Sequence, residues 1–358
     1  MFKIPTVIII GAGASKDFNY PLGPDLLSTI INGLVSASNR LKASRYIDTT
    51  VPNVVDFLGL RYQVLYNLAA AKKHDIVPYS HVQLDEFVEA AQGQTLRSID
   101  RFLRDHQEHS EVGKFLIAFE LVCCSYQRHA DSGRVALNDF SKPSNLHWIS
   151  GLINEIREGA MNAEELKSNN LTIVTFNYDD VLERAFDAQM ENTSRHKGAN
   201  WREFIKIEHV YGSLKKLPVN PNTHTLFEAA HAIAPELGYI HEQTGIVKFN
   251  ERVDRLRDTL RNAQRIISLG FSFDQANVEL LALDKRVGRN MIALNYDGNI
   301  GLQSTLESFG AKEYVHHDRA VPTTIGKAIE LGILQFQRST PLPHLPVIQP
   351  PLPFIKRK

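Results

Sequence analysis

Five short apolar runs of the chain have the length and the side-chain chemistry of buried β-strands. They cover residues 6–10, 171–175, 205–210, 265–269 and 291–294. Nearly continuous runs rich in Val and Ile are typical of central strands in a parallel sheet, where both faces are covered. We therefore expect these five segments to form a parallel sheet.

Helical patterns follow most of these runs. Residues 180–190, 250–264 and 276–283 each place apolar side chains on one face of a helix. Because strands and helices alternate along the chain, the pattern predicts an α/β fold, a Rossmann-like doubly wound parallel sheet.

The long segment between the first two strands shows helical patterns and no convincing strand. One helix is expected to start at Pro24, since proline suits the first helical turn. Further helices are expected over residues 53–71, 84–91, 98–106, 112–126 and 144–157. The pattern thus predicts a helical subdomain of residues 41–159, inserted into a Rossmann-like domain of residues 1–40 and 160–335.

Composition narrows the classes of function. Apolar residues make up 43% of the chain, and Lys plus Arg equals Asp plus Glu at 40 each. A protein that binds nucleic acid by itself usually has a basic excess, so we expect no direct contact with nucleic acid. The two cysteines are the adjacent Cys123 and Cys124, which excludes a four-cysteine zinc site and fits a reducing compartment.

Neither a signal peptide nor a run of about 18 apolar residues is evident, so we expect a cytoplasmic protein without a membrane span. Residues 339–358 are rich in proline, which favours an extended conformation. This tail either lies along the protein's own surface or stays mobile, or it docks on a partner or a sister subunit.

A glycine-rich loop, Gly11-Ala12-Gly13-Ala14-Ser15, directly follows the first strand. Glycine allows a sharp turn and a close backbone approach to an anion, and a helix that starts after such a loop attracts phosphate. Lys16 stands where the dinucleotide fingerprint has its third glycine, and residues 26–38 contain no acid. The loop is therefore either a phosphate-binding loop or a tight strand-to-helix turn.

Polar residues also follow the other strands. Asn177 and Asp179 come after the second strand, His209 ends the third, and Gly270 and Ser272 follow the fourth. The carboxyl edge of an open α/β sheet is where ligands bind, so we expect these residues to converge on one site. Helix capping by Asn177 or Asp179, and a structural role for His209, are the alternatives.

Jointly these stretches resemble the sirtuin-like family, in particular its bacterial branch of NAD-hydrolysing antiphage defence proteins. The resemblance spans roughly residues 6 to 300, and the helical block is similar to the insertion of that branch. It is carried by Gly11–Ser15, Tyr20–Gly23, Ser98–Leu103, Thr175–Asp179, His209–Ser213 and Gly270–Phe273.

The resemblance assigns roles along a bound NAD. Asn177 would lie beside the nicotinamide ribose and be needed for bond cleavage, and Asp179 would shape the nicotinamide side of the pocket. By the same resemblance, the pyrophosphate would be bound by Gly11, Ala12, Gly13 and Ser15. Gly270 and Ser272 would contact the adenosine half, and Asn295 would lie in the turn near the adenine ribose.

Many sirtuins place the catalytic histidine directly before a glycine, where this chain has Tyr211. His209 lies two residues earlier, and by strand geometry it shares a face with Tyr211. We therefore expect His209 to be the catalytic base and Tyr211 to line the cofactor site, with Tyr211 in the catalytic position as the alternative.

The resemblance implies an NAD+ hydrolase that releases nicotinamide and ADP-ribose, with NAD as substrate and no metal. The missing zinc module disfavours an NAD-dependent protein deacylase, which remains one alternative; a non-catalytic NAD or ADP-ribose sensor is another. Lys16 and the absent acid disfavour a dehydrogenase. The resemblance also implies a homo-oligomer that assembles with a hexameric ATPase of the HerA type.

Overall fold

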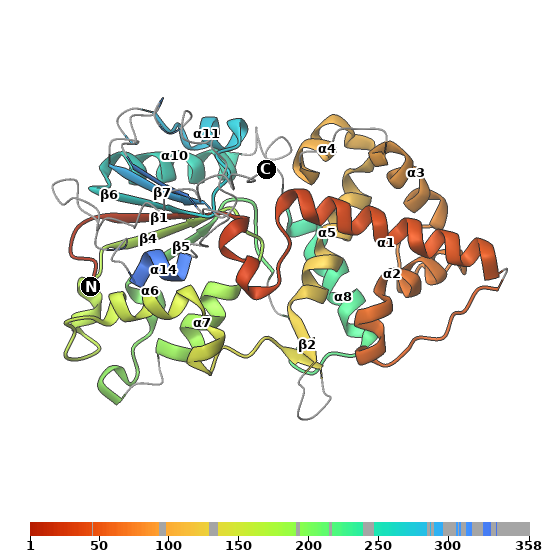
Figure 1. Ribbon diagram of the computed structural model, residues 1–358, viewed down its shortest axis with the longest axis horizontal. Helices are drawn as coiled ribbons and strands as arrows, with labels where there is room; N and C mark the ends of the chain where they lie inside the picture. The colour runs from red at the N-terminus through yellow and green to blue at the C-terminus, as the bar shows by residue number, and fades with distance from the viewer. Residues whose placement is uncertain are drawn as a thin grey trace, which may run out of the picture.

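The computed structural model shows two lobes that lie side by side, a sheet lobe and a helical lobe (Figure 1). It describes residues 1–44, 46–92, 98–128, 135–190, 194–214, 217–238, 247–284, 287, 290–295, 306, 308, 313–316, 325–330 and 334. The proline-rich segment 339–358 lies outside the described residues.

The sheet lobe is built on six parallel strands in the order β5-β4-β1-β6-β7-β8. In chain order this is 3-2-1-4-5-6, the strand order of dinucleotide-binding folds, and the order reverses beside β1. The predicted α/β, Rossmann-like sheet is confirmed, and β8 is a strand that the pattern did not predict. The strands are β1 (Thr6–Ile10), β4 (Leu171–Thr175), β5 (Ile205–His209), β6 (Arg265–Leu269), β7 (Met291–Asn295) and β8 (Glu313–His316).

Helices cover both faces of the sheet (Figure 1). Val7 and Ile9 of β1 pack on the side of α10 (Val247–Asn262) and α11 (Gln275–Leu281). Alternate residues of β1 point to the opposite face, where α6 (Trp148–Arg157), α7 (Val181–Met190) and α14 (Ile325–Glu330) lie. A strand covered on both sides has no polar face, which explains the continuous apolar sequence of β1.

The helical lobe contains six α-helices and a small hairpin among its described residues. Helices were expected in five of these positions, and the structure confirms them; α8 was missed. The helices are α1 (Gly23–Ser44), α2 (Val54–Ala70), α3 (His81–Gln92), α4 (Ile99–Asp105), α5 (Ser110–Cys124) and α8 (Thr223–Ile233). The hairpin pairs β2 (Tyr126–Arg128) with β3 (Val135–Leu137), so the expectation of a strand-free segment was wrong. Strands of three residues are too short to leave a pattern.

The lobes divide the chain differently from the predicted boundaries at residues 41 and 159. Helix α1 packs against α2, α3 and α5, so it belongs to the helical lobe from Gly23 onward. Helix α8 follows β5 in the chain and packs against α5, whereas α6 packs against α7 and α14 under the sheet. The periodicity of a helix shows which face is buried but not which partner buries it.

Short 3-10 turns connect many of these elements. They are η1 (Ala12–Ala14), η2 (Lys16–Phe18), η3 (Gln107–His109), η4 (Pro143–Asn145), η5 (Glu165–Ser168), η6 (Ser194–His196), η7 (Trp201–Glu203) and η8 (Ala234–Glu236). Within the described ranges, no helix combines the length and the apolar character that a membrane crossing requires.

Candidate functional site

The loops that follow β1, β4 and β6 meet where the strand order reverses. The N–H of Gly11 donates to the carbonyl oxygen of Leu269 at 3.0 Å, and the N–H of Phe176 donates to that of Ile10 at 2.9 Å. These bonds continue the hydrogen bonding between the strands beyond their carboxyl ends. The first residues of the loops are therefore held at fixed positions relative to one another.

Glycines allow two of these loops to touch backbone to backbone. Gly270 has a φ of +61°, and a Cβ on it would lie 2.3 Å from the nitrogen of Ala14. A Cβ on Gly11 or Gly13 would lie 2.6 or 2.9 Å from atoms of Gly270. No side chain fits at these three positions without a backbone shift, so the glycines have a packing role here, whatever they bind.

The glycine loop uses most of its N–H groups internally. Hydrogen bonds to backbone carbonyls are made by the N–H groups of Gly11, Gly13, Ala14 and Ser15. Among the described residues the N–H of Ala12 makes none, so it is the group that this loop offers to an anion. The 3-10 turn η1 lies within the loop, η2 follows it, and α1 begins at Gly23. The helix expected to start at Pro24 is therefore confirmed, and its N-terminus lies beyond η2 rather than next to the loop.

Asn177, Ser15 and Asp179 form a chain of hydrogen bonds between the loops after β1 and β4. Nδ2 of Asn177 donates to the carbonyl oxygen of Gly11 at 3.0 Å and to Oγ of Ser15 at 2.7 Å. Oγ of Ser15 donates in turn to Oδ2 of Asp179 at 2.6 Å. The amide oxygen of Asn177 forms no hydrogen bond with the described residues, which leaves it for a ligand.

The capping alternative holds in part for this loop. Oδ1 of Asp179 accepts a hydrogen bond of 3.3 Å from the N–H of Val181 at the start of α7, so Asp179 does cap that helix. Its other oxygen binds Ser15. Burial raises the pKa of Asp179, and the hydrogen bond from Ser15 opposes this shift. The side chain of Asn177 takes no part in capping.

The imidazole of His209 is held at both nitrogens. Nδ1 lies 2.9 Å from the carbonyl oxygen of Asn177, and Nε2 lies 2.7 Å from Oε1 of Glu183 on α7. Burial lowers the pKa of His209, but the hydrogen bond and the charge of Glu183 raise it more, so the net shift is upward. Each ring nitrogen faces an oxygen atom, so protonation of the ring satisfies both contacts, and the ring ties the backbone of Asn177 to α7.

Glu183 is a site residue that the sequence reasoning missed. It lies in the first turn of α7, one turn beyond Asp179. The signal was present, because a carboxylate at that position of the predicted helix 180–190 faces the same sheet edge as Asp179. The partner that it binds, however, comes from another strand.

Tyr211 lies on the opposite side of the sheet from His209. Its hydroxyl donates to Oδ1 of Asn277 on α11 at 2.6 Å, and its ring packs on Phe176 with the ring centroids 5.6 Å apart. The expectation that His209 and Tyr211 share a face is wrong. Strand β5 ends at His209, so the alternation of side chains ends there too.

The remaining predicted positions lie along β6 and β7. Gly270 contacts the glycine loop, and its N–H donates to the carbonyl oxygen of Leu294 at 2.8 Å. Ser272 is exposed two residues farther on. Asn295 is the last residue of β7, beside this loop, and its side chain lies outside the described part of the structure.

Three carboxylates lie in the loop after β4 and the first turn of α7. Burial raises the pKa of Asp180 to about 7, while the nearby charge of Arg184 lowers it. With Asp179 and Glu183, three acidic side chains lie within five residues. Arg184 lies 3.7 Å from Asp180, and His209 lies 2.7 Å from Glu183, so basic side chains accompany two of these carboxylates. No three His, Cys, Asp or Glu side chains within the described ranges are placed to hold a metal ion.

A separate cavity of about 620 Å3 lies beside α6 and α14, with Arg157, Arg195 and His196 in its walls. None of the site residues described above lines it.

No protein-family model and no curated protein sequence matches this chain.

Proposed function

We propose that this protein is an NAD+ hydrolase that converts NAD+ and water to nicotinamide and ADP-ribose. The observation that carries the proposal is the position of Asn177. Its amide is fixed between Gly11 and Ser15 at the point where a sheet of dinucleotide-binding order reverses. The sirtuin-like motifs around these residues support the same reaction.

The bond between nicotinamide and C1′ of the ribose breaks through a transition state with positive charge on the sugar, as in glycoside hydrolysis. In the proposed reaction the free amide oxygen of Asn177 accepts a hydrogen bond from a ribose hydroxyl or from the attacking water. The carboxylates of Asp179 and Asp180 stabilise the developing charge. His209 contributes by holding the backbone of Asn177 in place.

The N–H of Ala12 would bind the pyrophosphate, and the exposed loop at Ser272 would lie along the adenosine half. Each of these contacts fixes the substrate without touching the reacting atoms. Such fixation lowers the barrier because the reactive end no longer has to find its orientation.

Uncontrolled NAD hydrolysis would poison the cell that makes the enzyme, so the activity needs a trigger. We place the protein in the cytoplasm as the effector of a bacterial antiphage system, a homo-oligomer bound to a hexameric HerA-type ATPase. The absence of net charge is consistent with leaving nucleic-acid contact to that partner. Light scattering, with and without the ATPase, tests the assembly.

The test of the activity is incubation with NAD+ followed by chromatography of the products, with and without the ATPase. Wild-type protein should release nicotinamide, and Asn177→Ala should lower the rate at least ~10²-fold, because a transition-state contact is lost. Asn154→Ala, at an exposed position of α6, is the matched control and should keep the wild-type rate. Equal release from wild type and Asn177→Ala would contradict the proposal.

One observation favours a second candidate, a sensor that holds NAD or ADP-ribose without turnover. Both nitrogens of His209 are occupied, so the side chain expected to act as base is bound within the protein. A sensor would bind ADP-ribose in equilibrium dialysis and release no nicotinamide with or without the partner. A deacylase would instead consume NAD+ only when an acylated peptide is present.

A further inference from the structure

Strand β5 is an edge strand of the sheet, since it pairs with β4 and with no other strand among the described residues. The backbone of a strand turns its hydrogen-bonding groups alternately toward one side and the other. The N–H of Val210 donates to the carbonyl oxygen of Thr175 on β4 at 2.9 Å. Counting back along the strand, the backbone groups of Ile205, Ile207 and His209 therefore point away from β4.

These outward backbone groups have no hydrogen-bond partner in the part of the chain that the structure describes. A groove of about 700 Å3 lies beside the strand, and Ile205 and Ile207 form part of its wall together with Trp201 of η7. A row of unpaired N–H and C=O groups next to a groove is a template for another extended strand. The edge of β5 is therefore a surface on which a further strand can be added.

The sequence of β5, Ile-Lys-Ile-Glu-His, is complementary to itself. When two copies of the strand run antiparallel with Ile207 opposite Ile207, Lys206 of each copy lies opposite Glu208 of the other. Side chains in directly opposite positions have Cβ atoms about 4.5–5.5 Å apart, which is within reach of an ion pair. Lys206 and Glu208 already form an ion pair of 2.8 Å within one chain. The pairing would join two such ion pairs into a network of four alternating charges.

The charges select this register among those that a two-fold axis allows. An axis at Lys206 would place two lysines opposite each other, and an axis at Glu208 would do the same with two glutamates. Like charges in directly opposite positions are destabilising. A lysine on an edge strand usually prevents pairing with another strand, but a glutamate two residues later offers it a partner of opposite charge.

The backbone geometry fits the same register. The N–H and C=O groups of Ile207 both point outward, so two copies of Ile207 form the hydrogen-bonded pair at the centre of the interface. Ile205 pairs in the same way with His209 of the second copy. On the face opposite to the charges, the two Ile207 side chains meet, and each is only partly buried in a single chain. One register thus satisfies the backbone, the charges and an apolar side chain.

We propose that β5 is an interface between two copies of this chain, which pair antiparallel about Ile207 and join their sheets into one continuous sheet. The homo-oligomer of the proposed function requires an interface, but this pairing does not depend on NAD+ hydrolysis. His209 is the last residue of β5, and its imidazole contacts the backbone of Asn177 and the carboxylate of Glu183. Pairing of the strand would therefore fix the strand end that contacts the candidate site.

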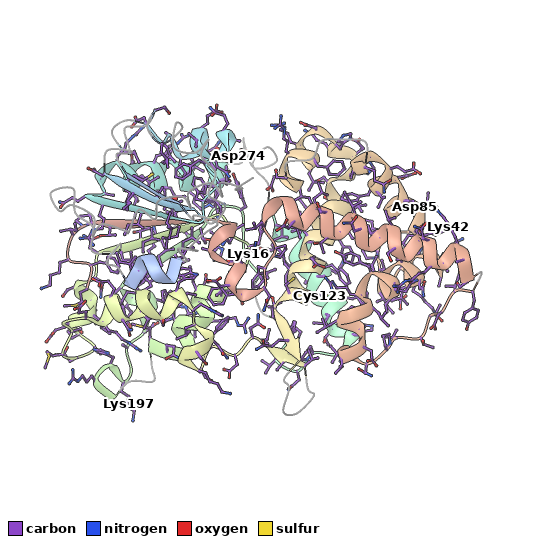
Figure 2. The ribbon with its side chains drawn as sticks, in the orientation of Figure 1. Lys16, Lys42, Asp85, Cys123, Lys197 and Asp274 are labelled. Atoms are coloured by element: carbon purple, nitrogen blue, oxygen red, sulfur yellow. The ribbon has the colours of Figure 1, made fainter. Side chains whose placement is uncertain are left out.

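The test is analytical ultracentrifugation of the full chain over a range of concentrations. Wild-type protein should sediment as a dimer or as a larger assembly with an even number of copies. Lys206→Glu makes both charges of the strand negative and Glu208→Lys makes both positive, so each variant should weaken self-association at least ~10-fold. Lys197→Glu is the matched control and should associate as wild type does, because Lys197 is exposed and lies at the end of the sheet lobe away from the strands (Figure 2).

The two single variants also test each other. Mixed in equal amounts, Lys206→Glu and Glu208→Lys should form a mixed dimer, because each strand carries the charges that the other lacks. A double variant that combines both substitutions exchanges the two charges, and it should associate with itself as wild type does. Thermal melts of each variant show whether the protein is folded, so that a loss of association is not mistaken for unfolding.

Ile207→Pro tests the contribution of the backbone. Proline removes the N–H that points outward and leaves in place the N–H groups that bond to β4. Self-association should weaken at least ~10-fold, since the central hydrogen-bonded pair is lost. Ile207→Val keeps the N–H and an apolar side chain, and it should associate as wild type does.

The outcomes separate this interface from the proposed function. Wild-type protein that stays monomeric overturns the interface, and so do folded charge variants that self-associate as strongly as wild type. Folded single variants that fail to associate when mixed overturn the register about Ile207. A wild-type dimer that the charge variants disrupt and their mixture restores supports the interface, even when that dimer releases no nicotinamide and the hydrolase function is thereby overturned.

Discussion

The side-chain amide nitrogen of Asn177 lies 2.7 Å from the hydroxyl oxygen of Ser15, although 162 positions separate them in the chain. The same hydroxyl donates to Asp179 at 2.6 Å, so one serine joins an amide and a carboxylate. All three side chains are less than a tenth exposed. This buried chain of hydrogen bonds fixes the relative position of the two loops.

Replacing Ser15 by Ala should therefore destabilise the fold and the site together. The amide of Asn177 and the carboxylate of Asp179 would each lose a buried partner, which costs about 1–3 kcal/mol. Urea unfolding measures this loss, and NAD+ turnover should fall as well because Asn177 is less well held. Ser144→Ala, at an exposed position of η4, should change the free energy of unfolding by less than about 0.5 kcal/mol. Equal stability of both variants would show that this chain of hydrogen bonds does not contribute to the free energy of unfolding.

Gly270→Ala should be poorly tolerated. The new Cβ would lie 2.3 Å from the nitrogen of Ala14, and the residue has a φ of +61°. Strain of this kind costs about 1–3 kcal/mol even before the contact is counted. The expected result is a lower Tm and weaker binding of ADP-ribose, because the glycine loop must move.

Gly59→Ala is the matched control for that substitution. Gly59 lies inside α2, and a Cβ added there would meet no atom within 4 Å. Alanine should stabilise the helix by about 0.5–1 kcal/mol, since glycine is the poorer helix former. If Gly270→Ala raised the Tm as Gly59→Ala should, the backbone contact between the two loops would not be a constraint.

Much of the fold was predictable because the pattern of apolar and polar residues within a short segment indicates a strand or a helix. Residues 6–10 are Thr-Val-Ile-Ile-Ile, and a run of this kind has few alternatives to a buried central strand. Helix α8 was missed although its signal is present. Asn222 and Thr225 form a capping box at its start, and this spacing is visible in the sequence.

At the candidate site, only the contacts that follow from strand order were predictable from the sequence. Ser15 and Asn177 follow neighbouring parallel strands, so their approach is a consequence of strand order. The orientation of His209 depends on Glu183, which comes from a helix, and no spacing along the chain encodes that contact. Tyr211 lies beyond the end of its strand, where tertiary packing rather than alternation sets the direction of a side chain.

The helical lobe contains a buried ion pair whose disruption should be costly. Nε and Nη2 of Arg61 each donate to the carboxylate of Glu120 at 2.7 Å, and the hydroxyl of Tyr62 donates to it at 2.9 Å. Glu120→Ala should destabilise the protein by about 3–5 kcal/mol, because a largely buried guanidinium loses its partner. Chemical denaturation measures the change.

A double variant separates the loss of the whole ion pair from the loss of one of its two charges. Arg61→Met combined with Glu120→Met removes both charges, and it should recover most of the stability lost in Glu120→Ala. Glu228→Ala, at an exposed position of α8, should have no measurable effect. If the double variant were as unstable as Glu120→Ala, the loss would come from packing and not from the unpaired charge.

The ion pair of His209 and Glu183 predicts a pH dependence of stability. The pKa of His209 in the folded protein is raised above its ordinary value of 6.5, since the pairing with Glu183 outweighs burial. A raised pKa means that the folded state binds the proton more tightly than the unfolded state. The stabilisation is therefore complete below pH 6.5 and is lost as the pH rises through the folded value.

His209→Gln isolates this contribution when urea unfolding is followed across the pH range. At acid pH the variant should be less stable than wild type by about 1.5–3 kcal/mol, the usual range for a hydrogen bond to a charged group, and the difference should shrink as the pH rises. Asp180, whose pKa burial raises to about 7, titrates in the same window, so the informative quantity is the difference between the two proteins at each pH. His224→Gln, on the exposed face of α8, should leave the curve unchanged. A difference that stays constant with pH would mean that the imidazole is neutral in the fold, and Nε2 would then be available as a base.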